Sequence, residues 1–304
     1  MNERLTRVRC DEGEVAVWRS GRAGGPPVVL LHNGGADHRI WDAQVPALAE
    51  RHDVLALDLL GFGDSAKPDV PYRLDLYCSM LEQVLARLGL DRPVLAGNCI
   101  GAATALEHAA RHAGAVRALA LFNVCGGRTM LRRSTGISFD ASPWRRPFFL
   151  ASARGINAVP FLQRRIVDTL FGRPARDLPI HAHVAAQQRT DWHPRSRWNL
   201  MRGLGSFNKY GEPYSRPDGL PPVLLAWGAA NRVLSIECGR DLAAGLRPDR
   251  FVEVPGAGHL VMCEEPEKVN ALLGDFLGAA GGTPPRFHLT ASRRARKDTA
   301  SPRG

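Results

Sequence analysis

The sequence predicts an α/β fold built on a mostly parallel central sheet, with a helical insertion. Short apolar segments alternate with amphipathic helical segments through most of the 304 residues, which is typical of a parallel sheet flanked by helices. The alternation stops between Val124 and about Arg216, where helical stretches are broken by prolines. A tight strand–turn–helix junction, G-N-C-I-G at Gly97–Gly101, precedes this interruption. With 44% hydrophobic residues, the chain is long enough for one sizeable core with an insertion.

The expected helices and strands follow from the periodicity of the apolar residues. Helices are predicted at Leu74–Leu88, where apolar residues recur on one face, at Ala102–Ala110, and at Pro266–Leu277, which closes the fold. Because the strands between such helices are mostly parallel, ligands are expected beyond their carboxyl ends. The predicted strands are Glu14–Trp18, Pro27–Leu31, Val54–Leu57, Val94–Ala96, Ala118–Phe122, Val223–Trp227 and Phe251–Val254.

The same pattern divides the chain into four segments. Residues 1–125 are expected to form the first part of the core, residues 126–216 a helical cap, and residues 217–280 the second part of the core. Residues 281–304 give no apolar period to bury, so a disordered basic tail is predicted there. This tail carries half of the formal net charge of +10. The charge is therefore no sign of a nucleic-acid partner, and none is expected.

Cys99 lies at the centre of the G-N-C-I-G sequence, which is a nucleophile elbow with a thiol in place of the usual hydroxyl. A predicted strand precedes it and a predicted helix follows it, as the motif requires. The flanking glycines let the chain pass closely through a strained turn, so Cys99 is expected to be exposed at a helix N-terminus. Partial positive charge at that terminus favours a thiolate. Cys99 is therefore the predicted nucleophile.

Three further motifs resemble those of the α/β-hydrolase family, in the family's order. Val28–Gly35 resembles a strand that ends in an HGGG-type loop, Asp58–Ser65 resembles the D-x-x-G-x-G-x-S loop, and Gly256–His259 resembles the histidine loop. The resemblance runs from about residue 10 to about residue 280. It implies the α/β-hydrolase fold and a catalytic His259.

The resemblance also implies an oxyanion hole made by backbone N–H groups. The elbow assigns one donor to Ile100, and the loop after His32 assigns the other to Gly34. Asn33, which replaces one glycine of the HGGG-type loop, is the alternative second donor.

The third catalytic position departs from the family's pattern. Asn231 stands where the G-x-x-D turn carries its acid, and a second acid position known in some members falls near Asn123. The matching set is therefore Cys99, His259 and Asn231, a Cys-His-Asn arrangement of the kind that papain-like proteases have. In a thiolate–imidazolium pair the third residue has mainly to orient the ring, which Asn231 is expected to do through its side-chain oxygen. The alternative is that Asn231 only caps the next turn.

Thiol chemistry narrows the expected substrate. When a thiolate attacks an alkyl ester it is itself the better leaving group, so the intermediate reverts, whereas thioesters, enol esters and lactones avoid this problem. Cysteine elbows occur in the dienelactone hydrolases and polyhydroxyalkanoate synthases, which this chain resembles only in its pentapeptide. The expected function is that of a thioesterase or acyltransferase-like hydrolase that forms an S-acyl-cysteine. The alternatives are a general small-ester or amide hydrolase and a non-catalytic ligand-binding homologue.

Composition limits the remaining possibilities. The cysteines show no C-x-x-C spacing, so neither a metal site nor a disulfide framework is expected, and no cofactor is implied. No apolar run approaches 18 residues and the first seven residues carry charges, so a cytoplasmic protein without a membrane partner is predicted. The expected partner is a small-molecule acyl substrate. Coenzyme A and carrier proteins are compatible carriers, since they are anionic and the chain is basic.

The cap segment is rich in aromatic and basic residues. These side chains either line an acyl pocket or pack the cap onto the core. They are Trp144, Arg145, Arg146, Phe148, Phe149, Phe161, Trp192, Trp198, Phe207 and Tyr210.

Overall fold

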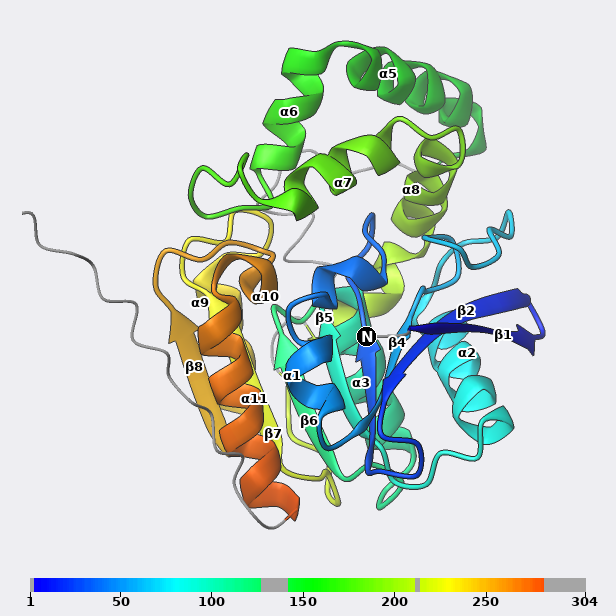
Figure 1. Cartoon of the computed structure of the whole chain (residues 1–304). Coiled ribbons are helices and arrows are strands. Elements are labelled where there is room, and N and C mark those ends of the chain that lie inside the picture. The colour runs from blue at the N-terminus through cyan, green and yellow to red at the C-terminus, as the bar shows by residue number, and fades with distance from the viewer. Residues whose placement is uncertain (1–2, 127–141, 211–213, 282–304) are drawn as a thin grey trace, which may run out of the picture.

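An eight-stranded sheet forms the centre of the protein in the computed structural model, which describes residues 3–126, 142–210 and 214–281 (Figure 1). Its strand order is β1-β2-β4-β3-β5-β6-β7-β8. Strand β2 pairs antiparallel with β1 and β4, and every pairing from β4 to β8 is parallel. The strands are β1 (Arg4–Cys10), β2 (Gly13–Gly21), β3 (Pro27–Leu31), β4 (Asp53–Leu57), β5 (Val94–Asn98), β6 (Ala118–Phe122), β7 (Val223–Gly228) and β8 (Arg250–Val254).

The strands are apolar on both faces because helices cover both faces. On β3, Val29 and Leu31 face one buried cluster while Val28 and Leu30 face another, as the two-residue period of a strand requires. The first cluster includes residues of α2 (Leu74–Arg87), α3 (Ile100–Arg111) and α9 (Ile236–Leu246). The second includes residues of η1 (His38–Trp41), α1 (Val45–Ala49), α10 (Val261–Glu264) and α11 (Pro266–Gly281).

Helices of the predicted cap lie over the carboxyl end of the sheet (Figure 1). Glycine at position 34 allows a close approach there, since a Cβ on Gly34 would come within 2.5 Å of the Cδ2 atom of Leu200 in α8. The described elements of this segment are η2 (Pro143–Arg145), α5 (Arg146–Ala158), α6 (Pro160–Asp168), α7 (Pro179–Gln188), α8 (Trp192–Gly203) and η3 (Leu204–Tyr210).

The predicted α/β-hydrolase architecture is confirmed, with differences at element ends. Strands β3 and β6 have the predicted bounds, and the helix predicted at Ala102–Ala110 begins two residues earlier, at Ile100. Strand β1 was not predicted. The tail predicted at residues 281–304 lies outside the described residues, apart from Gly281 at the end of α11. Among the described helices, none has the length and apolar character needed to cross a bilayer.

Candidate active site

Cys99 lies at the sharp junction between β5 and α3. Its backbone adopts φ 55° and ψ −113°, a left-handed conformation that is strained for a residue with a side chain. Its N–H donates to the carbonyl of Phe122 at 3.0 Å, which ties the turn to β6. Gly101 is required because a Cβ there would come within 2.5 Å of the Leu31 carbonyl oxygen. The strand, turn and helix predicted for the elbow are therefore all present.

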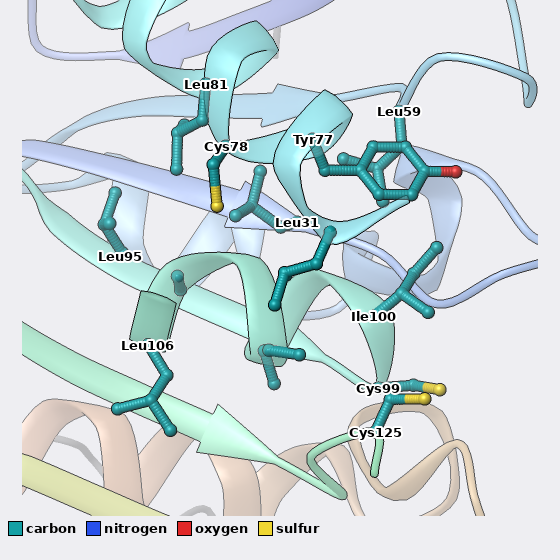
Figure 2. Close-up of a cluster of buried hydrophobic side chains, with 14 of the residues drawn as sticks. Leu31, Leu59, Tyr77, Cys78, Leu81, Leu95, Cys99, Ile100, Leu106 and Cys125 are labelled. Carbon is teal, nitrogen blue, oxygen red and sulfur yellow. The ribbon is translucent and has the colours of Figure 1, made fainter. Parts of the chain in front are cut away.

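The Cys99 side chain is buried rather than exposed, so that part of the prediction was wrong. The residue is 2% exposed and packs in the buried cluster that also contains Leu31, Ile100 and Leu200 (Figure 2). Cys125 lies beside it: the Cys125 N–H donates to the Cys99 carbonyl at 3.2 Å, and the two sulfur atoms are adjacent in Figure 2. No sequence motif pointed to this second thiol, because 26 positions separate Cys125 from Cys99.

The contacts of the Cys99 sulfur favour its thiolate. A hydrogen bond from the Cys125 thiol is the largest cause and, with hydrogen bonds from His259 and the Ile100 N–H, it outweighs burial and lowers the pKa of Cys99 below the ordinary value of a thiol. The same contact raises the pKa of Cys125, so Cys125 keeps its proton and acts as the donor. These contacts therefore shift Cys99 towards its thiolate form.

His259 lies on the loop after β8, where several backbone contacts hold it. Its N–H donates to the carbonyl of Leu170 at 2.8 Å. Its own carbonyl accepts from the side-chain amides of Asn98 and Asn123, each at 3.1 Å. The buried carboxylate of Glu264 accepts from the Gly258 N–H at 2.7 Å and so fixes the start of the loop. The ring is thereby placed beside Cys99, with which it shares a hydrogen bond.

Asn231 contacts the ring of His259, but through its nitrogen. The Oδ1 atom accepts from the N–H groups of Val233 at 2.9 Å and Leu234 at 3.0 Å. The Nδ2 atom lies 3.1 Å from His259 Nδ1. Because Nδ2 only donates, Nδ1 must accept and the neutral ring carries its proton on Nε2. The prediction that Asn231 orients the ring through its oxygen was wrong, although both the contact with the ring and the cap on the next turn are present.

Hydrogen bonds among the side-chain amides of Asn231, Asn123 and Asn98 fix the direction in which the Asn231 amide points. The Oδ1 atom of Asn123 accepts from Asn231 Nδ2 at 3.0 Å and from the Gly228 N–H at 3.1 Å. The Nδ2 atom of Asn123 in turn donates to Asn98 Oδ1 at 3.1 Å. Asn123 has φ 45°, which asparagine tolerates better than most residues. The only sequence signal for Asn123 was its match to the alternative acid position.

The predicted oxyanion loop lies against the elbow. A Cβ on Gly34 would be 3.6 Å from the Cδ1 atom of Ile100, so the two predicted donor residues are neighbours. His32 fixes the loop: its Nδ1–H donates to the Asn33 carbonyl at 2.7 Å, while Nε2 accepts from the Leu59 N–H at 2.8 Å. The Asn33 side chain donates to the Gly34 carbonyl at 3.1 Å. The structure thus brings together all five predicted site residues: Gly34, Cys99, Ile100, Asn231 and His259.

The aromatic residues of the cap differ in their burial. Phe207 and Tyr210 pack in the buried cluster with α2 and α3, as the packing alternative proposed. The side chains of Trp144, Phe148 and Phe161 are instead largely exposed, at 63%, 70% and 64%. These three therefore line no buried acyl pocket.

We expect iodoacetamide to alkylate Cys99 ahead of the other five cysteines when the reaction is run at about pH 6. The reactive species is the thiolate, and burial raises the pKa of Cys10 and raises that of Cys78 to about 12. Limiting reagent followed by peptide mapping measures the order of labelling. Labelling of Cys10 or Cys238 with an inert Cys99 would remove Cys99 as the nucleophile.

The pH dependence of that alkylation tests the two contacts that favour the thiolate. In the wild-type protein the rate should rise at a pH well below the ordinary pKa of a thiol and then level off. Cys125→Ala and His259→Ala should each move this rise to higher pH, because each removes a partner of the Cys99 sulfur. Cys125→Ser is the matched control, since its hydroxyl still donates. Superimposable profiles in the wild type and both alanine variants would contradict this account of the thiolate.

The fold and the elbow define the class of the protein. A family model for the alpha/beta hydrolase fold matches residues 26–266, and the chain belongs to that family. It is a hydrolase of this fold.

Among the relatives in this family, one is a 2-hydroxy-6-oxo-6-(2'-aminophenyl)hexa-2,4-dienoic acid hydrolase of Metapseudomonas resinovorans. It is 38% identical over 250 residues, which cover 80% of this chain and 81% of the relative. A 2-hydroxymuconate semialdehyde hydrolase of Pseudomonas sp. (strain CF600) is 28% identical, with 84% and 88% of the two chains covered. The enol-lactonase structure from Burkholderia xenovorans LB400 matches with a TM-score of 0.73 at 22% identity, over 90% of this chain and 99% of that chain.

Proposed function

We propose that the protein cleaves a thioester or a similarly activated acyl donor through an S-acyl-Cys99 intermediate, with water or a second nucleophile as the acyl acceptor. The observation that carries the proposal is the environment of Cys99, whose sulfur is surrounded by the Cys125 thiol, the His259 ring and the Ile100 N–H, contacts that lower its pKa. A nucleophile that is already ionised needs no base to remove its proton as it attacks.

The direction of the hydrogen bond between Asn231 and His259 supports an acyl donor with a good leaving group. With Nδ1 accepting from Asn231, His259 presents an Nε2–H to the reacting centre and has no second proton to give away. Such a ring can hydrogen-bond a departing thiolate or enolate, which is stable without full protonation. An alkoxide requires a proton as it leaves, so alkyl esters are the poorer substrates.

In this mechanism the Cys99 thiolate attacks the acyl carbon, and the carbonyl oxygen becomes an oxyanion. The N–H groups of Ile100 and Gly34 stabilise that charge. The bond to the leaving group then breaks, and the leaving anion accepts a hydrogen bond from His259 Nε2–H. The acyl group remains on Cys99 as a thioester until the acceptor attacks its carbonyl carbon, gives up its proton to the solvent, and expels Cys99 as the thiolate.

A matched pair of substrates tests this proposal. The same acyl group is offered as a thioester and as its alkyl oxygen ester, and turnover is measured for each. We expect the thioester to be cleaved much faster, because only its leaving group matches the attacking thiolate. Equal rates would favour the general ester hydrolase, and binding of both without turnover would favour the ligand-binding homologue.

One observation favours a second candidate function. The relative that is 38% identical bears the name of a hydrolase for a 2-hydroxy-6-oxo-dienoic acid. An enolate is also a stabilised leaving group, so the same arrangement of Cys99 and His259 suits such a substrate. Assay of that acid beside the thioester distinguishes the two, since the proposal requires the thioester to have the higher kcat/KM.

We expect Gly34→Pro to lower turnover by about 100-fold or more, because it deletes one backbone donor to the oxyanion. The matched control is Gly34→Ala, which keeps the N–H and meets the same flexible Leu200 side chain. Steady-state kinetics on both variants, with thermal unfolding to check their folding, measure the effect. If the two folded variants have equal turnover, the Gly34 N–H is not a donor and Asn33 becomes the candidate.

A further inference from the structure

Three potential metal ligands lie together at the far end of α3 from Cys99. His108 and His112 are four positions apart, so they share one face at the end of the helix. Glu82 reaches them from α2, and His112 Nε2 lies 2.9 Å from its Oε1 atom. One ligand atom from each of the three side chains lies within 4.8 Å of the others, and the imidazole ring centroids are 4.8 Å apart.

Two imidazoles and one carboxylate are a donor set typical of zinc. Ligand atoms bound tetrahedrally at about 2.0–2.2 Å from zinc are separated by about 3.4 Å. In this cluster the pair formed by His112 Nε2 and Glu82 Oε1 is closer than that, at 2.9 Å, and no pair of ligand atoms is more than 4.8 Å apart. The side chains of Glu82 and His112 are 39% and 42% exposed, so small side-chain rotations can close the gap.

His108 is available as a ligand. It is 5% exposed, and its buried Nδ1 atom has no hydrogen-bond partner in the described part of the chain. A buried ring nitrogen without a partner is unfavourable, and native structures commonly resolve it with a ligand or a water. A metal ion between α2 and α3 would supply that partner.

The charges around the cluster favour a cation. The last carbonyls of α3 carry partial negative charge, and Glu82 adds a carboxylate. The nearby guanidinium of Arg111 is already paired with Glu107 at 2.8 Å and Asp75 at 2.7 Å. A surface hollow of about 380 Å³, lined by the three ligands and Asp91, gives the ion a path from solvent and leaves room for a water.

We propose that Glu82, His108 and His112 bind one divalent ion of the zinc class, with water as the fourth ligand, and that the ion holds α2 against α3. His108 lies nine residues along the helix from Cys99, a rise of about 13 Å. The ion is therefore separate from the reacting centre, and its expected effect is on stability. Sequence reasoning missed the site because Glu82 comes from a different helix.

Zinc titration of the tag-free full-length protein tests the proposal, by calorimetry and by the change in Tm. We expect one equivalent to bind and to raise Tm, because an ion that binds only the native state stabilises it. Glu82→Gln and His112→Gln should each weaken binding by about tenfold or more, since loss of even an indirect partner costs that much. The double variant should not bind, and the matched control His52→Gln should bind like the wild type.

Cobalt adds a second readout, since Co²⁺ bound by imidazole gives visible absorption that should disappear in the double variant. Zinc binding that persists in Glu82→Gln/His112→Gln would overturn the proposal, and so would a wild-type protein that binds no zinc. Binding that is lost in Cys99→Ala but kept in the double variant would also overturn it, because the ion would then belong to the two thiols and His259.

Discussion

Cys99→Ala should lower turnover by about 10⁴-fold or more, the scale on which enzymes lose rate when a nucleophile is removed. Cys125, which lies beside it, is not expected to replace it, because burial raises the pKa of Cys125 even without the Cys99 contacts. Steady-state kcat on the best thioester measures the loss.

The control for this change is Cys238→Ser, which alters a half-buried thiol on α9. It should keep the wild-type kcat. If Cys99→Ala retained activity within tenfold of the wild type, the reaction would not pass through Cys99, and the protein would be a hydrolase with another nucleophile.

The double variant Cys99→Ser/Asn231→Asp should gain alkyl-ester hydrolysis of about 100-fold or more over Cys99→Ser alone, since removing a triad carboxylate from a serine enzyme costs even more. A serine must pass its proton to His259, which then carries N–H on both ring nitrogens. In the single variant the Nδ1–H would face the Nδ2 donor of Asn231. In the double variant it would face a carboxylate oxygen, which accepts.

The gain in ester hydrolysis depends on a rearrangement of Asn123. A carboxylate at position 231 would also face Asn123 Oδ1, which lies 3.0 Å from the present amide nitrogen. The Asn123 side-chain amide must therefore flip by about 180°. Thermal unfolding should show that the double variant is modestly less stable than the wild type. Asn231→Asp on the Cys99 background is the matched control. Equal ester activity in Cys99→Ser and in the double variant would remove Asn231 from the mechanism.

Much of the fold could be predicted because the central strands are apolar on both faces. Strands such as β3 and β6 are short runs of buried residues between turns, and their bounds follow from that pattern. Strand β1 lacks the pattern. It is an edge strand that pairs only with β2, and in its sequence RLTRVRC only Val8 and Cys10 are buried. Three of its seven residues are arginines, so no apolar pattern marked the segment as a strand.

The candidate site could be predicted as a set of positions but not as a set of contacts. The elbow and the histidine loop have local sequence signatures, so Cys99 and His259 could be assigned. The direction of the Asn231 amide depends on Asn123 and on two backbone N–H groups, and no local pattern encodes it. The donor from Cys125 likewise depends on how β6 ends beside β5, which only the folded chain determines.

The central claim is that the acyl group passes through Cys99. Mixing the protein with an acyl thioester, stopping the reaction with acid and measuring intact mass tests this most directly, with peptide mapping to locate the adduct. The account predicts an added acyl group on the Cys99 peptide, which Cys99→Ala lacks. Turnover without any adduct at the earliest times, or an adduct on a different residue, would contradict it.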